Sequence, residues 1–253
     1  MYFDTHAHYD NSRFDVDRQT LLEHLPQNQV SLVLNPGCNM PTSQKAIEYA
    51  TRYAHIYAAV GFHPHYTIEM QTGDIAKLKE LATHEKVCAI GEIGLDYHYD
   101  FSPRDVQKAS FQAQMQLAQE LQLPSIIHSR EATEDTLEML RMFLGQTGVV
   151  HCFSGSLETA KQVLDLGYYI GFTGVLTFSN ARKSREIVSY MPKDRLLLET
   201  DAPYMAPVPH RGKRSDSTQL SAIAEVVAEL WNTSAEEVAD ITRENGKRLF
   251  GIS

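Results

Sequence analysis

The chain has 253 residues, 43% of them hydrophobic, and a formal net charge of −9, which suits one large α/β domain or two small ones. The acidic charge argues against broad coating of nucleic acid but leaves room for a local cationic site. No apolar run is long enough to predict a membrane span. No leader pattern predicts export. The odd number of cysteines, without paired spacing, indicates reduced thiols and a cytoplasmic location.

Short apolar runs rich in β-branched residues alternate with longer amphipathic runs along the chain. The short runs predict eight strands, at residues 2–6, 30–37, 56–64, 87–94, 124–129, 148–155, 168–174 and 195–201. The amphipathic runs include 41–54, 110–123, 156–167 and 234–251. Ser156 and Ser234 are the expected N-caps of the last two, and Gly167 ends the helix that Ser156 begins.

This alternation predicts a single-domain α/β fold, a (β/α)8 TIM barrel over residues 1–253. A doubly wound open sheet is the competing architecture. That fold usually carries a Gly-rich phosphate turn after its first strand, where this chain instead has His6 and His8. We therefore favour the barrel.

The carboxyl-terminal ends of the expected strands carry an unusual number of polar side chains, and active sites of barrel enzymes lie at this end. His6 and His8 would project to the same side of the first strand. A single histidine at a strand end is more often structural. Several such residues together are better explained as a functional site, because the segments that carry them are far apart in sequence but converge at one rim of a barrel. The residues are His6, His8, His63, His65, Glu92, His128, His151 and Asp201.

Six of these residues suit a centre for two divalent ions, with one ion at His6, His8 and Asp201, the other at His128 and His151, and Glu92 bridging both. Such a pair would retain positive charge after neutralisation by Glu92 and Asp201, which favours an anionic substrate. Two ions can also activate water. We expect Glu92 and Asp201 to be catalytic and His65 not to be a ligand.

The stretch "APVPHRGKRSD" follows Asp201 and places Arg211, Lys213 and Arg214 near the expected centre. A solvated basic loop is the usual interpretation of such a run. On an acidic chain, three cations in four residues instead suggest phosphate recognition. Tyr204 could stack on the substrate or hydrogen-bond to it, and a packing role is equally open.

Seven segments in order, "DTHAHYD", "GFHPH", "GEIGLDYHYD", "IIHSREA", "HCFSGS", "LLLETDAPY" and "APVPHRGKR", closely resemble the TatD family of metal-dependent deoxyribonucleases. The resemblance runs from residue 2 to the "LFG" near the C-terminus. It implies an amidohydrolase-like TIM barrel that hydrolyses DNA phosphodiester bonds, often from 3′ to 5′ and with Mg²⁺. By motif it implies the same six metal ligands, with His63 on the substrate side.

The resemblance fails at residues 215–218, which read "SDST" where the family usually has Asn, an acidic residue and Pro. This departure puts substrate contacts in doubt but leaves the metal ligands unchanged.

Three functions are compatible with this sequence. The leading one is a cytoplasmic, monomeric deoxyribonuclease acting on single-stranded DNA or 3′ ends. An amidohydrolase or esterase, such as a D-aminoacyl-tRNA deacylase, would use the same fold and metals. A binding protein on a former enzyme scaffold is disfavoured, because all six ligand positions hold competent residues. Mg is the metal that the resemblance implies, while imidazole-rich shells also suit Zn, Mn, Fe or Ni.

Overall fold

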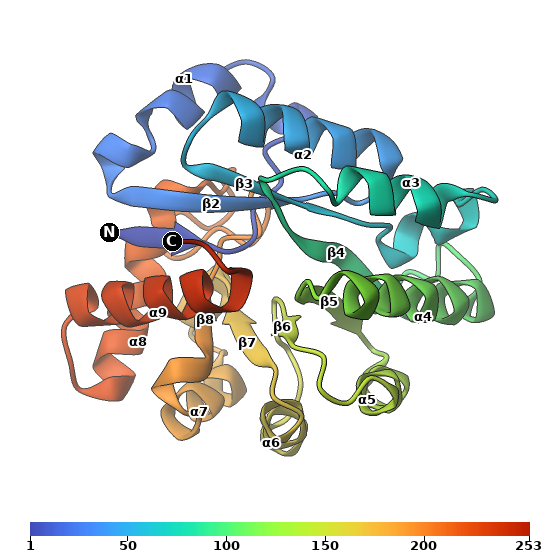
Figure 1. The fold of residues 1–253 in the computed structure, drawn as a ribbon. Helices are drawn as coiled ribbons and strands as arrows, with labels where there is room; N and C mark the ends of the chain where they lie inside the picture. The colour runs from blue at the N-terminus through green and yellow to red at the C-terminus, as the bar shows by residue number, and fades with distance from the viewer.

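Eight parallel strands follow one another in one sheet, so that neighbours in sequence are also neighbours in space (Figure 1). The computed structural model describes residues 1–253. The strands are β1 (Tyr2–Asp4), β2 (Val30–Pro36), β3 (Ile56–Val60), β4 (Val87–Asp96), β5 (Ser125–Arg130), β6 (Gly148–Val150), β7 (Tyr169–Phe172) and β8 (Leu196–Leu198).

Helices surround these strands (Figure 1). They are α1 (Arg18–His24), α2 (Met40–Arg52), α3 (Asp74–Leu81), α4 (Arg104–Leu121), α5 (Thr133–Met142), α6 (Leu157–Asp165), α7 (Arg182–Tyr190), α8 (Leu220–Trp231) and α9 (Ala235–Phe250). The predicted single-domain (β/α)8 barrel is thus confirmed. None of these helices combines the length and the apolar character that crossing a membrane requires.

The barrel closes where the chain after β1 meets the chain after β8. The Thr5 backbone N–H donates to the Leu198 carbonyl over 3.2 Å, and Ala7 forms a parallel bridge with Ala202. The predicted first strand reached His6, whereas β1 ends at Asp4 because the Asp4 carboxylate itself accepts the His6 N–H. The chain nevertheless continues between β2 and β8, which carries His6 into the barrel mouth.

The predicted helix ends agree with the structure where capping residues mark them. Ser156 accepts the Thr159 N–H over 3.1 Å, Ser234 accepts the Glu237 N–H over 3.2 Å, and Gly167 has a φ of 87°. Helix α4 begins at Arg104, six residues before the predicted start at residue 110. Its first turns are polar and largely exposed, so they lack the hydrophobic periodicity on which the prediction depended.

The barrel interior is apolar at the end where the strands begin and polar at the opposite end, the mouth. A cluster of 12 buried residues includes Phe3, Leu34 and Leu197 from the strands and also Leu249 and Phe250 from the end of α9. Helix α9 thereby closes the end of the barrel at which the strands begin. The polar side chains gather at the opposite end, as is usual in barrels of this class.

Gly246 of α9 allows this helix to approach β1 closely. A Cβ atom at this position would lie 2.6 Å from Phe3 Cδ1, in a part of the core where Phe3 is 1% exposed. Gly→Ala in an exposed helix normally stabilises by about 1 kcal/mol. At Gly246 we expect the opposite sign, a destabilisation of about 1–3 kcal/mol, because the core is overpacked.

Urea denaturation of Gly246→Ala measures this effect. Glu244→Ala, on the exposed side of the same helix, serves as the control and should change the free energy of unfolding by no more than about 0.5 kcal/mol. A Gly246→Ala protein more stable than the wild type would show that α9 does not press on β1.

Candidate metal centre

Glu92 of β4 lies at the centre of the polar cluster, with its side chain only 3% exposed. Its Oε2 atom lies 3.3 Å from His6 Nε2 and 3.4 Å from His8 Nε2. Its Oε1 atom lies 2.7 Å from His151 Nε2 and 3.0 Å from His128 Nδ1. The two oxygens of one carboxylate therefore face two different pairs of histidines.

The first position is formed by His6, His8 and Asp201. The two Nε2 atoms of His6 and His8 are 3.1 Å apart. Asp201 Oδ1 lies 3.6 Å from His8 Nε2 and 3.9 Å from His6 Nε2, and the Asp201 N–H donates to the His6 carbonyl. Closure of the barrel between β8 and β1 thus brings both histidines to Glu92 Oε2 and Asp201 Oδ1 to the two histidines.

The second position is formed by His128 at β5 and His151 just after β6. His128 Nδ1 and His151 Nε2 are 3.4 Å apart. The other ring nitrogen of His128, Nε2, lies 3.0 Å from Asp96 Oδ2. A carboxylate behind a histidine holds the proton on the nitrogen it faces and leaves the other nitrogen free to bind a metal. Asp96 thereby directs the His128 Nδ1 lone pair toward Glu92.

Asp96 is a site residue that the sequence pattern did not indicate. It is fully buried and ends β4, two residues beyond the predicted strand. Its separation of four residues from Glu92 along an extended strand was the only indication that both side chains share a face.

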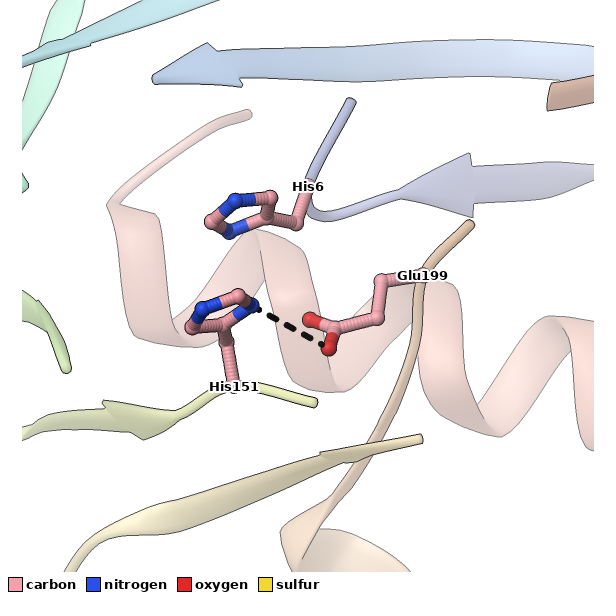
Figure 2. Close-up of side chains that lie close together, drawn as sticks. All are labelled: His6, His151 and Glu199. Atoms are coloured by element: carbon pink, nitrogen blue, oxygen red, sulfur yellow. Dashed lines mark ion pairs between the residues drawn. The ribbon is translucent and has the colours of Figure 1, made fainter. Parts of the chain in front are cut away.

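Figure 2 shows Glu199, a second carboxylate that the sequence pattern did not indicate, close to the rings of His6 and His151. The rings of His6 and His151 stack with centroids 3.9 Å apart, and Glu199 Oε1 lies 3.7 Å from His151 Nδ1. Glu199 also accepts the Cys152 backbone N–H. A Cβ atom on Gly171 would lie 2.5 Å from Glu199 Oε2, so the glycine provides the space for this carboxylate.

His63 and His65 have different surroundings. His63 Nδ1 accepts the His65 backbone N–H over 3.1 Å, so the proton of the neutral ring is on Nε2, which points at Glu92 Oε1 over 3.4 Å. Burial lowers the pKa of His63 to about 4. His65 Nε2 instead lies 3.0 Å from Asp96 Oδ2. His63 therefore offers an N–H to the site, and its expected place on the substrate side stays a prediction.

The charges in the cluster favour a bound cation. Burial raises the pKa of Glu92, but the surrounding histidines outweigh burial and hold this pKa well below its usual range. Burial lowers the pKa of His151, but the Glu92 carboxylate outweighs it and raises the value to about 10. An ionised buried carboxylate thus draws positive charge onto its neighbours.

The donor atoms fit divalent metals. Edges of a tetrahedral or octahedral shell with bonds of about 2.0–2.1 Å are about 2.9–3.4 Å long, close to most spacings described above. The donors are imidazole nitrogens and carboxylate oxygens, a set that suits Zn, Mn, Fe or Ni and includes oxygens for Mg. Furthermore, His6 Nδ1, His151 Nδ1 and Glu199 Oε2 are buried without hydrogen-bond partners, which marks this region as a polar site and not as packing.

The basic loop contributes fewer free cations than its sequence suggested. Both Arg214 guanidinium nitrogens lie 2.6 Å from the Asp17 carboxylate, so this cation is paired. The Arg211 guanidinium lies 4.4 Å from the centre of the Phe178 ring, and Lys213 makes no ion pair. Arg211 and Lys213 are thus the two cations of the loop that no carboxylate neutralises.

The "SDST" departure is linked to the first metal position through Asp4, whose Oδ1 accepts the His6 N–H over 3.3 Å. Ser217 is fully buried and donates to Asp4 Oδ2 over 2.6 Å, and its Oγ lies 2.7 Å from the Tyr9 hydroxyl. Asp4 also accepts the Thr200 hydroxyl. Tyr204, in contrast, is 47% exposed, and its hydroxyl accepts an N–H of Asn11.

The parallel (β/α)8 barrel with a histidine and carboxylate cluster at its mouth fits a metal-dependent hydrolase. The family described as "TatD related DNase" matches residues 3–251, and the chain belongs to this family within the amidohydrolase-like enzymes.

Three relatives illustrate the similarity. The chain is 46% identical to "Uncharacterized metal-dependent hydrolase YabD" of Bacillus subtilis (strain 168), over 255 residues and 100% of both chains. It is 36% identical to "3'-5' ssDNA/RNA exonuclease TatD" of Rahnella sp. (strain Y9602), over 99% of this chain and 98% of the relative. The crystal structure of YJJV, a TatD homolog from Escherichia coli K12, superposes with a TM-score of 0.93 at 32% identity, covering 100% and 98% of the chains.

We predict that Asp96→Asn weakens metal binding about 10- to 100-fold, because the amide no longer enforces the Nε2 proton on His128. Its remaining oxygen can still accept the backbone N–H groups of His98 and Tyr99, so the fold should persist. Calorimetric titration with Mn²⁺ measures the affinity. Asp240→Asn, on the exposed face of α9, is the matched control. Equal affinity in the Asp96 and Asp240 variants would exclude a positioning role for Asp96.

Proposed function

We propose that this protein hydrolyses phosphodiester bonds of single-stranded nucleic acid, DNA in particular, from the 3′ end, with two divalent ions per chain. The observation that carries the proposal is the Glu92 carboxylate, whose two oxygens face separate donor sets. One ion would be held by His6, His8 and Asp201 and the other by His128 and His151, with Glu92 touching both.

When bound, such a pair supplies Lewis-acid polarisation of the phosphodiester and lowers the pKa of water. The chain's own residues contribute orientation and proton transfer. Asp201 Oδ1 faces the histidine pair, whereas Oδ2 has no protein partner and the side chain is 13% exposed. Oδ2 can thus accept a proton from an attacking water molecule. The His63 Nε2–H can donate to a phosphate oxygen.

Two observations support nucleic acid as the substrate. The relative from Rahnella is named as an exonuclease of single-stranded DNA and RNA. Arg211 and Lys213 add two cations without acidic partners to an otherwise acidic chain, and phosphate recognition requires such local charge. We propose Mg²⁺ as the working metal, and a monomeric enzyme of the cytoplasm, where its three free cysteines stay reduced.

A second candidate retains the metal centre and changes the bond: an amidohydrolase or esterase such as a D-aminoacyl-tRNA deacylase. The pairing of Arg214 with Asp17 removes one of three expected phosphate contacts, which favours a small amide or ester over a polyanion. The 46% identical relative from Bacillus subtilis is also named only as a metal-dependent hydrolase. Parallel assays of single-stranded DNA, RNA and D-aminoacyl-tRNA separate these candidates.

We expect 5′-labelled single-stranded DNA to be shortened stepwise from its 3′ end with Mg²⁺ or Mn²⁺. Glu92→Gln should lower the rate at least about hundredfold, because it replaces the charge shared by both ions and retains the shape. Glu229→Gln, an exposed substitution of the same chemistry, is the control. Near wild-type turnover by folded Glu92→Gln would refute the bridging role. If the wild type released amino acid from D-aminoacyl-tRNA but cleaved neither DNA nor RNA, the deacylase would be the correct function.

The basic loop gives a separate prediction. Arg211→Ala or Lys213→Ala should weaken binding of single-stranded DNA about tenfold and reduce its salt dependence, because each removes a phosphate contact. Metal content should not change. Fluorescence anisotropy at two salt concentrations provides both values. Arg248→Ala, an exposed cation near the end of α9, is the control. Unchanged affinity and salt dependence in both loop variants would leave the loop as solvated surface.

A further inference from the structure

Two large aromatic side chains lie exposed at the mouth of the barrel, in the loop between β4 and α4. Tyr99 is 48% exposed and Phe101 is 62% exposed. Their rings are stacked, with centroids 5.1 Å apart and an angle of 19° between the planes. Exposed apolar rings are unfavourable in water, and an exposed apolar patch often marks a binding site. Because aromatic rings prefer to stack, this pair at the mouth of the barrel suits a flat ligand.

The chain beneath these rings is firmly held. The Asp96 carboxylate accepts the backbone N–H groups of His98 and Tyr99. At the other end of the loop, Ser102 is fully buried, and Gln107 of α4 donates to its carbonyl over 2.8 Å. The rings are therefore exposed on an ordered loop. Because the loop backbone is already held in place, binding of a ligand would cost little further conformational entropy.

The ring pair adjoins the metal centre through His65. The His65 ring makes edge contacts with Tyr99 at 5.4 Å and with Phe101 at 4.9 Å, and its centroid lies 6.2 Å from that of His128. Both His65 and His128 contact the same Asp96 oxygen at 3.0 Å. The buried Asp96 carboxylate thus positions both His128, a proposed metal ligand, and His65, which contacts the two aromatic rings.

The charge around the rings suits an anionic, aromatic ligand. The Arg130 guanidinium lies 4.8 Å from the Tyr99 ring centre and has no carboxylate partner. The nearby Asp100 carboxylate forms an ion pair with Arg104, and the Glu131 carboxylate lies 2.7 Å from His98 Nδ1. Arg130 therefore adds a cation that makes no ion pair of its own beside the rings, which favours a base attached to phosphate over a neutral aromatic group.

We propose that Tyr99 and Phe101, flanked by Arg130, form a stacking platform for a base of the single-stranded nucleic acid hydrolysed at the adjacent centre. This inference rests on the proposed function. Stacking on an aromatic ring tolerates every base, since each has a π-face. A base within a duplex is already stacked, so the platform selects single strands over duplexes without strong preference for sequence.

The test compares KM and kcat on a 3′-labelled single strand for the wild type, Phe101→Ala and Phe101→Trp. We expect Phe101→Ala to raise KM about tenfold with little change in kcat, and Phe101→Trp to restore the wild-type KM. Tyr190→Ala is the matched control, because Tyr190 is 54% exposed but ends α7 on the side of the barrel away from its mouth.

A second substrate with abasic residues at its 3′ end separates stacking from a structural effect. The platform predicts that Phe101→Ala and the wild type cleave the abasic strand with equal KM. An equal loss on both substrates, or no loss on either, would overturn the platform while the nuclease assignment stands. A wild-type protein that cleaves no strand with any metal would overturn the proposed function and the platform together.

Discussion

The Glu92 carboxylate is ionised in a place that is nearly closed to water, with 3% of its side chain exposed. Burying such a charge costs several kcal/mol unless neighbouring groups compensate for it. Here compensation comes from imidazoles on both sides, carried by β5 and by the segments after β1 and β6. This constraint explains why so many histidines converge on one point, and why the same point attracts divalent cations. The barrel supplies the convergence, because its parallel strands all end at one rim.

Further carboxylates stabilise the groups around Glu92. Asp96 orients His128, and Glu199 lies behind His151. Asp4 binds the chain after β8 through Thr200 and the later loop through Ser217. A metal ligand with a defined orientation usually depends on such outer contacts. The loops therefore do more than cover the barrel: they fix the angles at which the rings face Glu92.

Much of this arrangement could be predicted from the sequence. Alternation of apolar runs and amphipathic helices identified the barrel, and strand ends indicated where His6, His8 and Glu92 would meet. The outer contacts could not be predicted, because they depend on loop paths. Nothing local to Arg214 indicates that its charge is paired with Asp17, nearly two hundred residues earlier in the chain. The roles of the six expected ligands, and of the loop cations toward substrate, stay predictions.

The proposed metal centre requires that one carboxylate, Glu92, bind two metal ions. Anomalous diffraction from crystals grown with Mn²⁺ tests it most directly, because it locates each ion without reference to activity. We expect two peaks, one beside each oxygen of Glu92, roughly 3.5–4 Å apart. A single peak, or peaks that leave Glu92 without a metal contact, would contradict it.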